Sequence, residues 1–347
     1  MKSKLFIFML VGMLALAACG PAKTDAPGTN DSINAFPVVI DNAEDSYPAK
    51  EPETDPEVTY PVSDIPEIKV LAPSSTTSIP ILLAAKYLPG MTVEIFDNHP
   101  QAHAQFISEP DTVLVTGLSV GINMFNNEVP IEIINTNVTG LAYLVSCNLE
   151  INSFADLKGH EIYLPFEGSP MEETTQFFVE KAGLKYGEDV KPIYAPFDTS
   201  TALIQQGQDA IVAMPQPAAT AMAAQECGHL GASFYETWNE VTGDTDGYPQ
   251  VAAFAKATFT KENSAWVKAF NVAVSKAIAD LQADPDAAVA EVAEHFKQPA
   301  PVLTKALLAT KFTVKSGQEM KDSVFHYYET IGKPLDEKFE GFFYTLP

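Results

Sequence analysis

Two loops of the chain place hydroxyl and glycine residues directly after an apolar segment. The first loop follows the segment 68–73 and consists of Ser74, Ser75, Thr76, Thr77 and Ser78. The second follows the segment 161–166 and contains Gly168 and Ser169. Hydroxyl groups both donate and accept hydrogen bonds, and free N–H groups at a helix start favour anionic or carbonyl oxygen. Both loops therefore suit contact with a polar solute.

The same residues also suit an ordinary structural role. Ser169 and Glu172 match the Ser-x-x-Glu capping box, and Pro170 fits the first helical turn because its missing N–H would be unpaired there. Ser78 lies just before Pro80 and is a second cap candidate. The sequence leaves both uses of these hydroxyls open.

Both loops belong to an alternation of short apolar strands and helix-length segments. Strands are predicted at 68–73, 92–97, 112–117, 131–138, 161–166, 191–197, 209–214 and 251–259. Helices are predicted at 79–88, 100–107, 118–126, 170–182, 199–206, 216–225, 286–297, 301–310 and 317–331, with a long one carrying the apolar stripe from Trp266 to Leu281. This alternation predicts an α/β protein whose sheets are mainly parallel. Helix starts then lie at the carboxyl ends of strands, where open α/β sheets bind ligands.

Composition narrows the classes of ligand. The net charge is −24, so nucleic acid is a poor partner, because its phosphates require a basic surface. All 21 basic residues are lysines. Without arginine, an anion has to be held by lysine, by backbone N–H groups or by hydroxyls, since the bidentate guanidinium fork is missing.

The N-terminal residues predict export. Lys2 and Lys4 precede an apolar run over 5–14, and small residues lead to Cys19. The segment Leu16–Cys19 resembles the lipobox of bacterial lipoproteins, in which the cysteine receives a diacylglycerol and becomes the first residue of the mature chain. An uncleaved anchor and an ordinary signal peptide are the alternatives, although the run is shorter than the roughly 20 residues of a spanning helix. We expect 1–19 to be the signal peptide and 20–66 to be a disordered acidic tether.

The chain has two further cysteines and six histidines, the residue types of disulfides and metal sites. For Cys147 and Cys227 we expect buried thiols, with a disulfide as the alternative, because sequence spacing does not give a Cα–Cα distance. His99 and His103 are four residues apart and are expected on a solvated helix face. No third metal ligand lies nearby in the sequence. We expect neither a metal nor a cofactor.

Several segments between 68 and 280 occur in an order that is typical of one family. Asp-Leu-Lys-Gly at 156–159 precedes a strand, Gly-Leu at 183–184 and Asp-Val at 189–190 follow the next helix, and Gly-Gln-Asp-Ala at 207–210 precedes another strand. Together they resemble substrate-binding proteins of ATP-binding-cassette (ABC) importers, specifically the nitrate/taurine type. That group includes binders of alkanesulfonates and of thiamine precursors.

The resemblance implies a two-lobe periplasmic-binding-protein type II fold. One lobe would comprise 68–145 plus 250–347 and the other 146–249, with crossings near 143–146 and 248–251. Ligand would bind between the lobes, and the loop 214–217 would close the site. The ligand-binding residues implied are Ser74, Ser75, Thr76, Thr77, Thr116, Gly117, Ser119, Thr136, Asn137, Gly168, Ser169, Gln216 and Tyr248.

The chain departs from the family pattern in having no arginine, which argues against a sulfonate or nitrate ligand. Thiamine-precursor binders use aromatic and acidic contacts. Candidates for such contacts are Tyr143, Phe166, Glu167 and Tyr248.

The resulting hypothesis is a monomeric, lipid-anchored extracytoplasmic receptor without catalytic residues, which passes a small solute to an ABC permease and its ATPase. The first alternative is an enzyme similar to thiamine-precursor synthases of the same fold. The cysteine-rich cluster of those enzymes is missing here, and we expect 167–170 to be a helix start rather than a nucleophile turn. The second alternative is a sensing lipoprotein that acts on a signalling partner.

Overall fold

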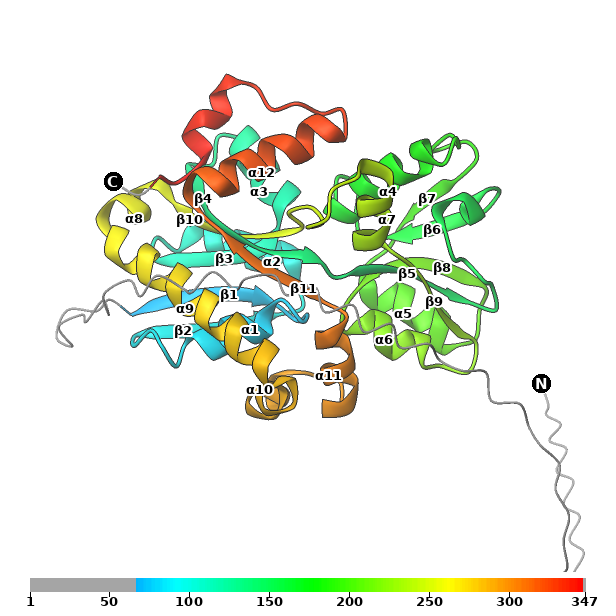
Figure 1. Cartoon of the computed structure of the whole chain (residues 1–347), viewed down its shortest axis with the longest axis horizontal. Coiled ribbons are helices and arrows are strands. Elements are labelled where there is room, and N and C mark those ends of the chain that lie inside the picture. The colour runs from blue at the N-terminus through cyan, green and yellow to red at the C-terminus, as the bar shows by residue number, and fades with distance from the viewer. Residues whose placement is uncertain (1–66, 346–347) are drawn as a thin grey trace, which may run out of the picture. The chain divides into compact units, whose positions relative to one another are not determined.

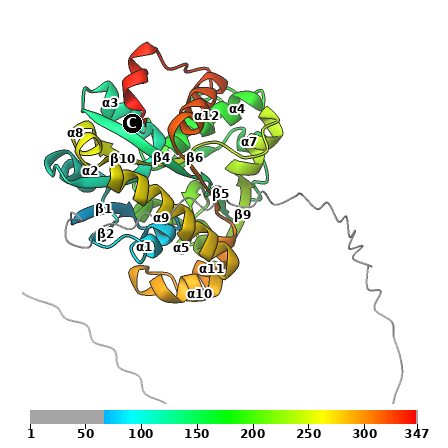
Figure 2. The same cartoon turned by 60° about the vertical axis from the view of Figure 1, so that its left-hand side comes forward.

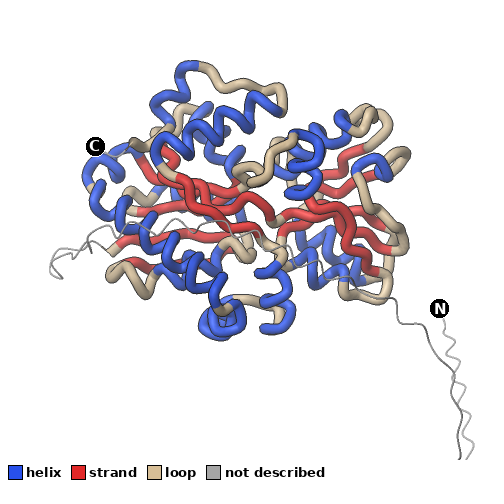
Figure 3. The backbone as a smooth tube through the Cα atoms, in the orientation of Figure 1, coloured by secondary structure: helices blue, strands red, loops and turns tan. Residues whose placement is uncertain are grey.

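The computed structural model describes residues 67–345, so the predicted signal peptide, Cys19 and the whole predicted tether lie outside the described residues. Within 67–345 the strands form two sheets with helices on both faces, as Figure 3 shows. We call each sheet with its helices a lobe. No helix in 67–345 is long and apolar enough to cross a membrane.

The sheet of the first lobe has six strands. Their order is β11 (Lys311–Lys315), β4 (Ile131–Gly140), β10 (Val251–Lys256), β3 (Thr112–Gly117), β1 (Ile68–Pro73) and β2 (Met91–Phe96). β1 pairs in parallel with β2 and β3, whereas β10 runs antiparallel to both of its neighbours and β11 runs antiparallel to β4.

The sheet of the second lobe has five strands. Their order is β7 (Lys191–Tyr194), β6 (Glu161–Leu164), β8 (Ala210–Pro215), β5 (Ala142–Cys147) and β9 (Gly228–Ser233). β6 is parallel to β7 and β8, and β5 is antiparallel to β8 and β9. The α/β fold class is confirmed, but both sheets are mixed rather than mainly parallel. The antiparallel strands β5, β9 and β11 had not been predicted.

Successive residues of each strand enter different cores because side chains alternate between the two faces of a sheet. In the first lobe, Val70 and Val113 face α1 (Ser78–Ala84) and α9 (Ser264–Ala283), which lie side by side in Figures 1 and 2. Leu71 and Leu114 join a second core on the opposite face. The helices of that face are α2 (His99–Ser108), α3 (Leu118–Asn126) and α12 (Gly317–Thr330).

That second core continues into the other lobe without a break. It includes residues of α4 (Pro170–Lys181) and α7 (Phe234–Thr242), while α5 (Phe197–Gln205) and α6 (Ala218–Ala223) cover the opposite face of the five-stranded sheet. The remaining helices are α8 (Ala257–Glu262), α10 (Pro285–Val292) and α11 (Ala300–Leu308), with short 3-10 turns at Phe154–Leu157, Ala293–His295 and Glu337–Phe342. The lobes thus share one apolar core.

The chain passes between the sheets at two places. β4 ends at Gly140 and β5 begins at Ala142, so the first passage is at Leu141 and the expected boundary at 145/146 falls inside β5. The second passage lies between the end of α7 at Thr242 and the start of β10 at Val251.

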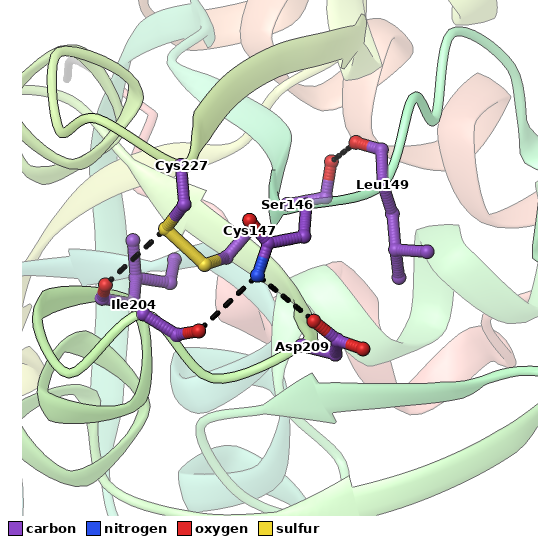
Figure 4. Close-up of a disulfide and its surroundings, with 8 residues drawn as sticks. Ser146, Cys147, Leu149, Ile204, Asp209 and Cys227 are labelled. Atoms are coloured by element: carbon purple, nitrogen blue, oxygen red, sulfur yellow. Dashed lines mark hydrogen bonds between the residues drawn. A yellow bond between two sulfur atoms is a disulfide. The ribbon is translucent and has the colours of Figure 1, made fainter.

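Cys147 and Cys227 form a disulfide, so the expectation of two buried thiols was wrong (Figure 4). Cys147 ends β5, and it lies opposite Gly228 in the antiparallel pair β5–β9. This pairing brings the two cysteine Cα atoms within 4.8 Å, inside the range that a disulfide spans. The residues are 80 positions apart, so only the strand pairing could reveal the bridge.

Candidate functional site

The loop between β1 and α1 forms the first part of the boundary between the lobes. The Ser74 N–H donates to the Phe96 carbonyl at 2.8 Å, and Ser78 Oγ donates to the Pro73 carbonyl. The hydroxyl of Thr310 donates to a backbone carbonyl, so the 2.8 Å contact with Thr76 makes the Thr76 hydroxyl the donor. Within this loop the hydroxyls of Ser75 and Thr77 are buried and have no hydrogen-bond partner.

Thr116 and Thr136 lie on the same sheet face, on either side of β10. Both are paired in register with Ala252 of β10, and residues directly opposite each other in antiparallel strands point to the same face. Each is 1% exposed, and neither hydroxyl has a hydrogen-bond partner. One of these buried hydroxyls therefore lies at the carboxyl end of β3 and the other in the middle of β4.

Asn137 lies at a bulge in β4. Val138 is opposite Val251 and Thr136 is opposite Ala252, which leaves Asn137 without a partner on β10. Its amide nitrogen donates to Asn135 Oδ1 at 3.0 Å, while its own Oδ1 is buried without a partner. Bulges of this kind change the direction of side chains near functional sites.

The second lobe contributes the start of α4. Ser169 Oγ accepts a hydrogen bond from the Glu172 N–H at 3.2 Å, which confirms the predicted cap. The reciprocal bond differs from the standard capping box, because the Glu172 carboxylate accepts the N–H of Gly168 rather than that of Ser169. The carboxylate also accepts hydrogen bonds from the hydroxyls of Tyr186 and Tyr194, so three donors fix the Glu172 side chain at this helix start.

Gln216 contributes an amide from the end of the second-lobe sheet. Its backbone N–H donates to the Leu141 carbonyl at 2.9 Å, and its Oε1 accepts the backbone N–H of Thr220 at 3.1 Å. The Nε2 group is buried and has no partner.

The expected loops of the two lobes contact each other at two points. The Thr76 N–H donates to the Gln216 carbonyl at 3.1 Å, and Ser119 Oγ donates to the Gly168 carbonyl at 3.1 Å. Gly117 lies so close to Pro170 that a Cβ atom there would be 2.4 Å from the proline Cγ. The structure thus brings these loops together.

We call the residues of the expected site that carry an unpaired buried polar atom the boundary set. Its members are Ser75, Thr77, Thr116, Thr136, Asn137 and Gln216. All are 5% exposed or less, and none carries a charge. Leaving one such group unpaired costs about 1–3 kcal/mol, so each of these groups is energetically unfavourable within the protein alone.

Tyr248 lies in an aromatic group with Trp238 and Tyr327. Its ring stacks on Tyr327 at 5.2 Å and lies 4.8 Å from Trp238, and its hydroxyl donates to Thr174 Oγ1 at 3.4 Å. Burial raises the pKa of this hydroxyl well above the ordinary value of a tyrosine. Glu173 borders the same group, and its Oε2 has no partner.

The other aromatic and acidic candidates are placed differently. The Tyr143 hydroxyl donates to the Ala309 carbonyl at 2.8 Å, across the two lobes. Phe166 and Glu167 are exposed. An open groove lined by Tyr235, Lys311 and neighbouring residues contains none of the ligand-binding residues that the resemblance implies.

One motif had been missed in the sequence. Gly117, Ser119 and Gly121 match the Gly-x-Ser-x-Gly pattern of a nucleophile turn, and the segment joins β3 to α3 as that motif requires. The Ser119 hydroxyl, however, donates to a backbone carbonyl of the other lobe rather than to a histidine. The small size of Gly121 is explained by packing, since the Phe254 ring occupies the space of a Cβ.

His99 and His103 are more buried than expected. Their rings lie 5.9 Å apart, His99 packs edge-on against Phe96, and His103 Nε2 is buried without a partner. Burial lowers the pKa of His103 to about 4. The described part of the chain contains no group of three or more side chains arranged to hold a metal ion.

Comparisons with known proteins agree with this architecture. Residues 130–288 match the family model described as NMT1/THI5 like. No curated protein sequence matches the chain.

Three solved structures illustrate the similarity of fold. The periplasmic aliphatic sulphonate binding protein SsuA from Escherichia coli has a TM-score of 0.64 at 18% identity, covering 81% of this chain and 93% of its own. An ABC transporter protein from Parabacteroides distasonis has a TM-score of 0.63 at 20% identity, with coverages of 82% and 100%. A zinc-bound ligand binding component of an ABC-type import system from Staphylococcus aureus has a TM-score of 0.66 at 12% identity, with coverages of 80% and 96%. The chain therefore has the two-lobe type II fold of periplasmic binding proteins, and its residues 130–288 confirm the family resemblance by their match to the NMT1/THI5-like model.

Proposed function

We propose that this protein is a lipid-anchored extracytoplasmic receptor that captures a small solute between its lobes and delivers it to an ABC permease. The fold and the family match support this proposal, as does the similarity to a sulphonate binding protein and to proteins of ABC transport systems. The disulfide supports an oxidising compartment, since such bridges are rare in the cytosol.

The boundary set is the observation that carries the proposal. Four hydroxyls and two amides of the expected site are buried without partners in the protein. A solute that hydrogen-bonds with them would remove this cost and would touch both lobes at once. It would then bind the closed arrangement more tightly than an open one and shift the population toward closure. No covalent step is needed, and we assign no catalytic residue.

Within the expected site, the members of the boundary set are the proposed solute contacts. Ser119 and Gly168 join the lobes directly, Thr76 bonds to Thr310 and to the Gln216 carbonyl, and Ser169 caps α4. The proposed roles of Ser74, Gly117 and Tyr248 are likewise to shape and support the site.

Membrane attachment is proposed through a diacylglycerol on Cys19, with the acidic segment 20–66 as tether and the protein acting as a monomer. The solute-loaded form would dock on a permease whose ATPase lies on the other side of the membrane. Cys19→Ala should abolish incorporation of a labelled fatty acid and release the protein from the membrane fraction. Unchanged labelling of this variant would exclude Cys19 as the acceptor.

Solute capture is tested by the thermal stability of the folded domain in the presence of a panel of small solutes. A specific ligand raises the melting temperature as its concentration rises, because it binds only the native state. In the double variant Thr116→Val, Thr136→Val, the response should be lost while the unliganded protein keeps its stability, since the two buried hydroxyls have no partners to lose. The matched control is Thr92→Val, at an exposed position of β2. An unchanged response in the double variant would contradict the proposed site.

A further inference from the structure

The orientation of two amides in the boundary set specifies the hydrogen-bonding character of the ligand. Asn137 lies at the end of a relay of three asparagines that crosses from β4 to α9. Asn271 Nδ2 donates to the Ile134 carbonyl at 3.0 Å, and Asn271 Oδ1 accepts from Asn135 Nδ2 at 2.7 Å. Asn135 Oδ1 in turn accepts from Asn137 Nδ2 at 3.0 Å.

A backbone carbonyl can only accept, so the amide atom of Asn271 that faces Ile134 has to be the nitrogen. This fixes the oxygen of Asn271 toward Asn135, and each following amide is oriented by the one before it. Reversing any single amide would place two donors or two acceptors opposite each other. The relay therefore presents Asn137 Oδ1, buried and unpartnered, as an obligate acceptor.

The side-chain amide of Gln216, in the second lobe, is also fixed in orientation, but here the donor rather than the acceptor is left unpaired. A backbone N–H can only donate, so the amide atom that receives the Thr220 N–H has to be Oε1. The Nε2 group is left buried without a partner and can only donate. Side-chain hydroxyls, by contrast, rotate to donate or accept as the ligand requires.

We propose that the solute bound between the lobes carries an N–H or O–H donor for Asn137 and an acceptor for Gln216, and that oxyanions with only acceptor atoms are excluded. This inference rests on the proposed function. Such an anion would place negative oxygen against Asn137 Oδ1, and no member of the boundary set supplies a compensating positive charge. Lys315 lies opposite Thr136 in the strand register, but its Nζ is 4.0 Å from the Glu319 carboxylate. Amides, aminated heterocycles and polyols belong to the accepted class.

Matched pairs of solutes test this distinction. Methanesulfonate and methanesulfonamide, acetate and acetamide, and nicotinate and nicotinamide are each nearly isosteric, and only the second member of each pair has an N–H donor. We would measure melting-temperature shifts for all six solutes and titrate those that respond by calorimetry. In every pair that responds, the amide should bind at least tenfold more tightly than the anion, because an unpaired buried acceptor costs about that factor or more. Native mass spectrometry would identify any solute retained during gentle purification, and that solute should contain a donor.

Two variants test whether the relay sets this preference. Asn137→Leu removes the acceptor and should weaken amide binding at least tenfold. Asn271 lies on α9, outside the boundary set, and Asn271→Leu leaves Asn135 and Asn137 free to change their amide orientation. The preference for amide over anion should therefore shrink. The melting temperature of the unliganded variant shows whether it is folded. Asn126→Leu, at an exposed position at the end of α3, is the control and should leave the preference unchanged.

The outcomes separate this inference from the proposed function. An anion that binds as tightly as its amide partner, or an unchanged preference in Asn271→Leu, would overturn the inference and leave solute capture intact. No response to any pair, together with no retained solute, would refute solute capture and the inference with it.

Discussion

Glu173 lies in the first turn of α4 and faces the first lobe. Its side chain is 13% exposed, its Oε2 has no hydrogen-bond partner, and its Oε1 is 3.8 Å from Lys333 Nζ. Tyr248, Tyr327 and Tyr328 lie around it, and Glu172 is adjacent on the same helix. Burial raises the pKa of Glu173 to about 7, although Lys333 acts in the opposite direction.

This pKa links the stability of the protein to pH. The folded value exceeds the reference value of 4.5, so the native state holds the proton more tightly than the unfolded chain. The corresponding stability is fully present below pH 4.5 and is lost as the pH rises through 7. A shift of this size corresponds to about 3 kcal/mol, because one pKa unit is about 1.4 kcal/mol.

Glu173→Gln replaces the carboxyl by a neutral group of the same shape. We expect the variant to be more stable than the wild type at pH 8 by up to about 3 kcal/mol, a value that already includes the attraction to Lys333, and to differ little from it at pH 4. Urea unfolding at several pH values between 4 and 8 measures this difference. Glu180→Gln, on an exposed position of the same helix, is the control. A difference between Glu173→Gln and wild type that does not grow with pH would refute the reasoning.

Two further predictions concern the disulfide and the contact between the lobes. Replacing both Cys147 and Cys227 by serine should lower the free energy of unfolding by about 4.5 kcal/mol, the loop-closure entropy for residues 80 apart, and a loss below 1 kcal/mol by denaturant titration would contradict this estimate. Gly117→Ala places a Cβ 2.4 Å from Pro170 Cγ, so the lobes should no longer reach full contact, and solute affinity should fall by about tenfold or more in calorimetric titration. The control for this variant is Gly341→Ala, which meets no atom within 4 Å, and equal affinities of the two variants would show that the contact is unimportant for binding.

Much of the fold could be predicted from local patterns. The apolar runs of β1, β3 and β8 and the stripe of α9 mark their elements within a few residues. Ser169, Pro170 and Glu172 likewise mark the start of α4, through the cap that the structure confirms. α7 was missed although Ser233 and Glu236 form a similar Ser-x-x-Glu signal, which the structure uses as a cap. These features depend on side chains and backbone groups within one or two helical turns, so the sequence alone contains them.

The site depends on contacts between distant segments. The residues of the boundary set could be nominated from the sequence, because Ser75 and Thr77 follow a predicted strand and the family resemblance implies the others. Tertiary packing decided which hydroxyls remain unpaired. The Thr76 hydroxyl bonds to Thr310, whereas the Thr77 hydroxyl is buried without a hydrogen-bond partner. The bulge at Asn137 and the orientation of its amide depend on β10 and on α9, more than a hundred residues away.

The sequence by itself determined the alternating strands and helices, the capped helix starts, the acidic character and the lack of arginine, because each is a property of composition or of neighbouring residues. Tertiary structure alone decided that both sheets are mixed, that Cys147 meets Cys227, and that the loops of the two lobes touch. Pairing between strands far apart in the chain is selected by the packing of the whole core, and no local pattern contains that information.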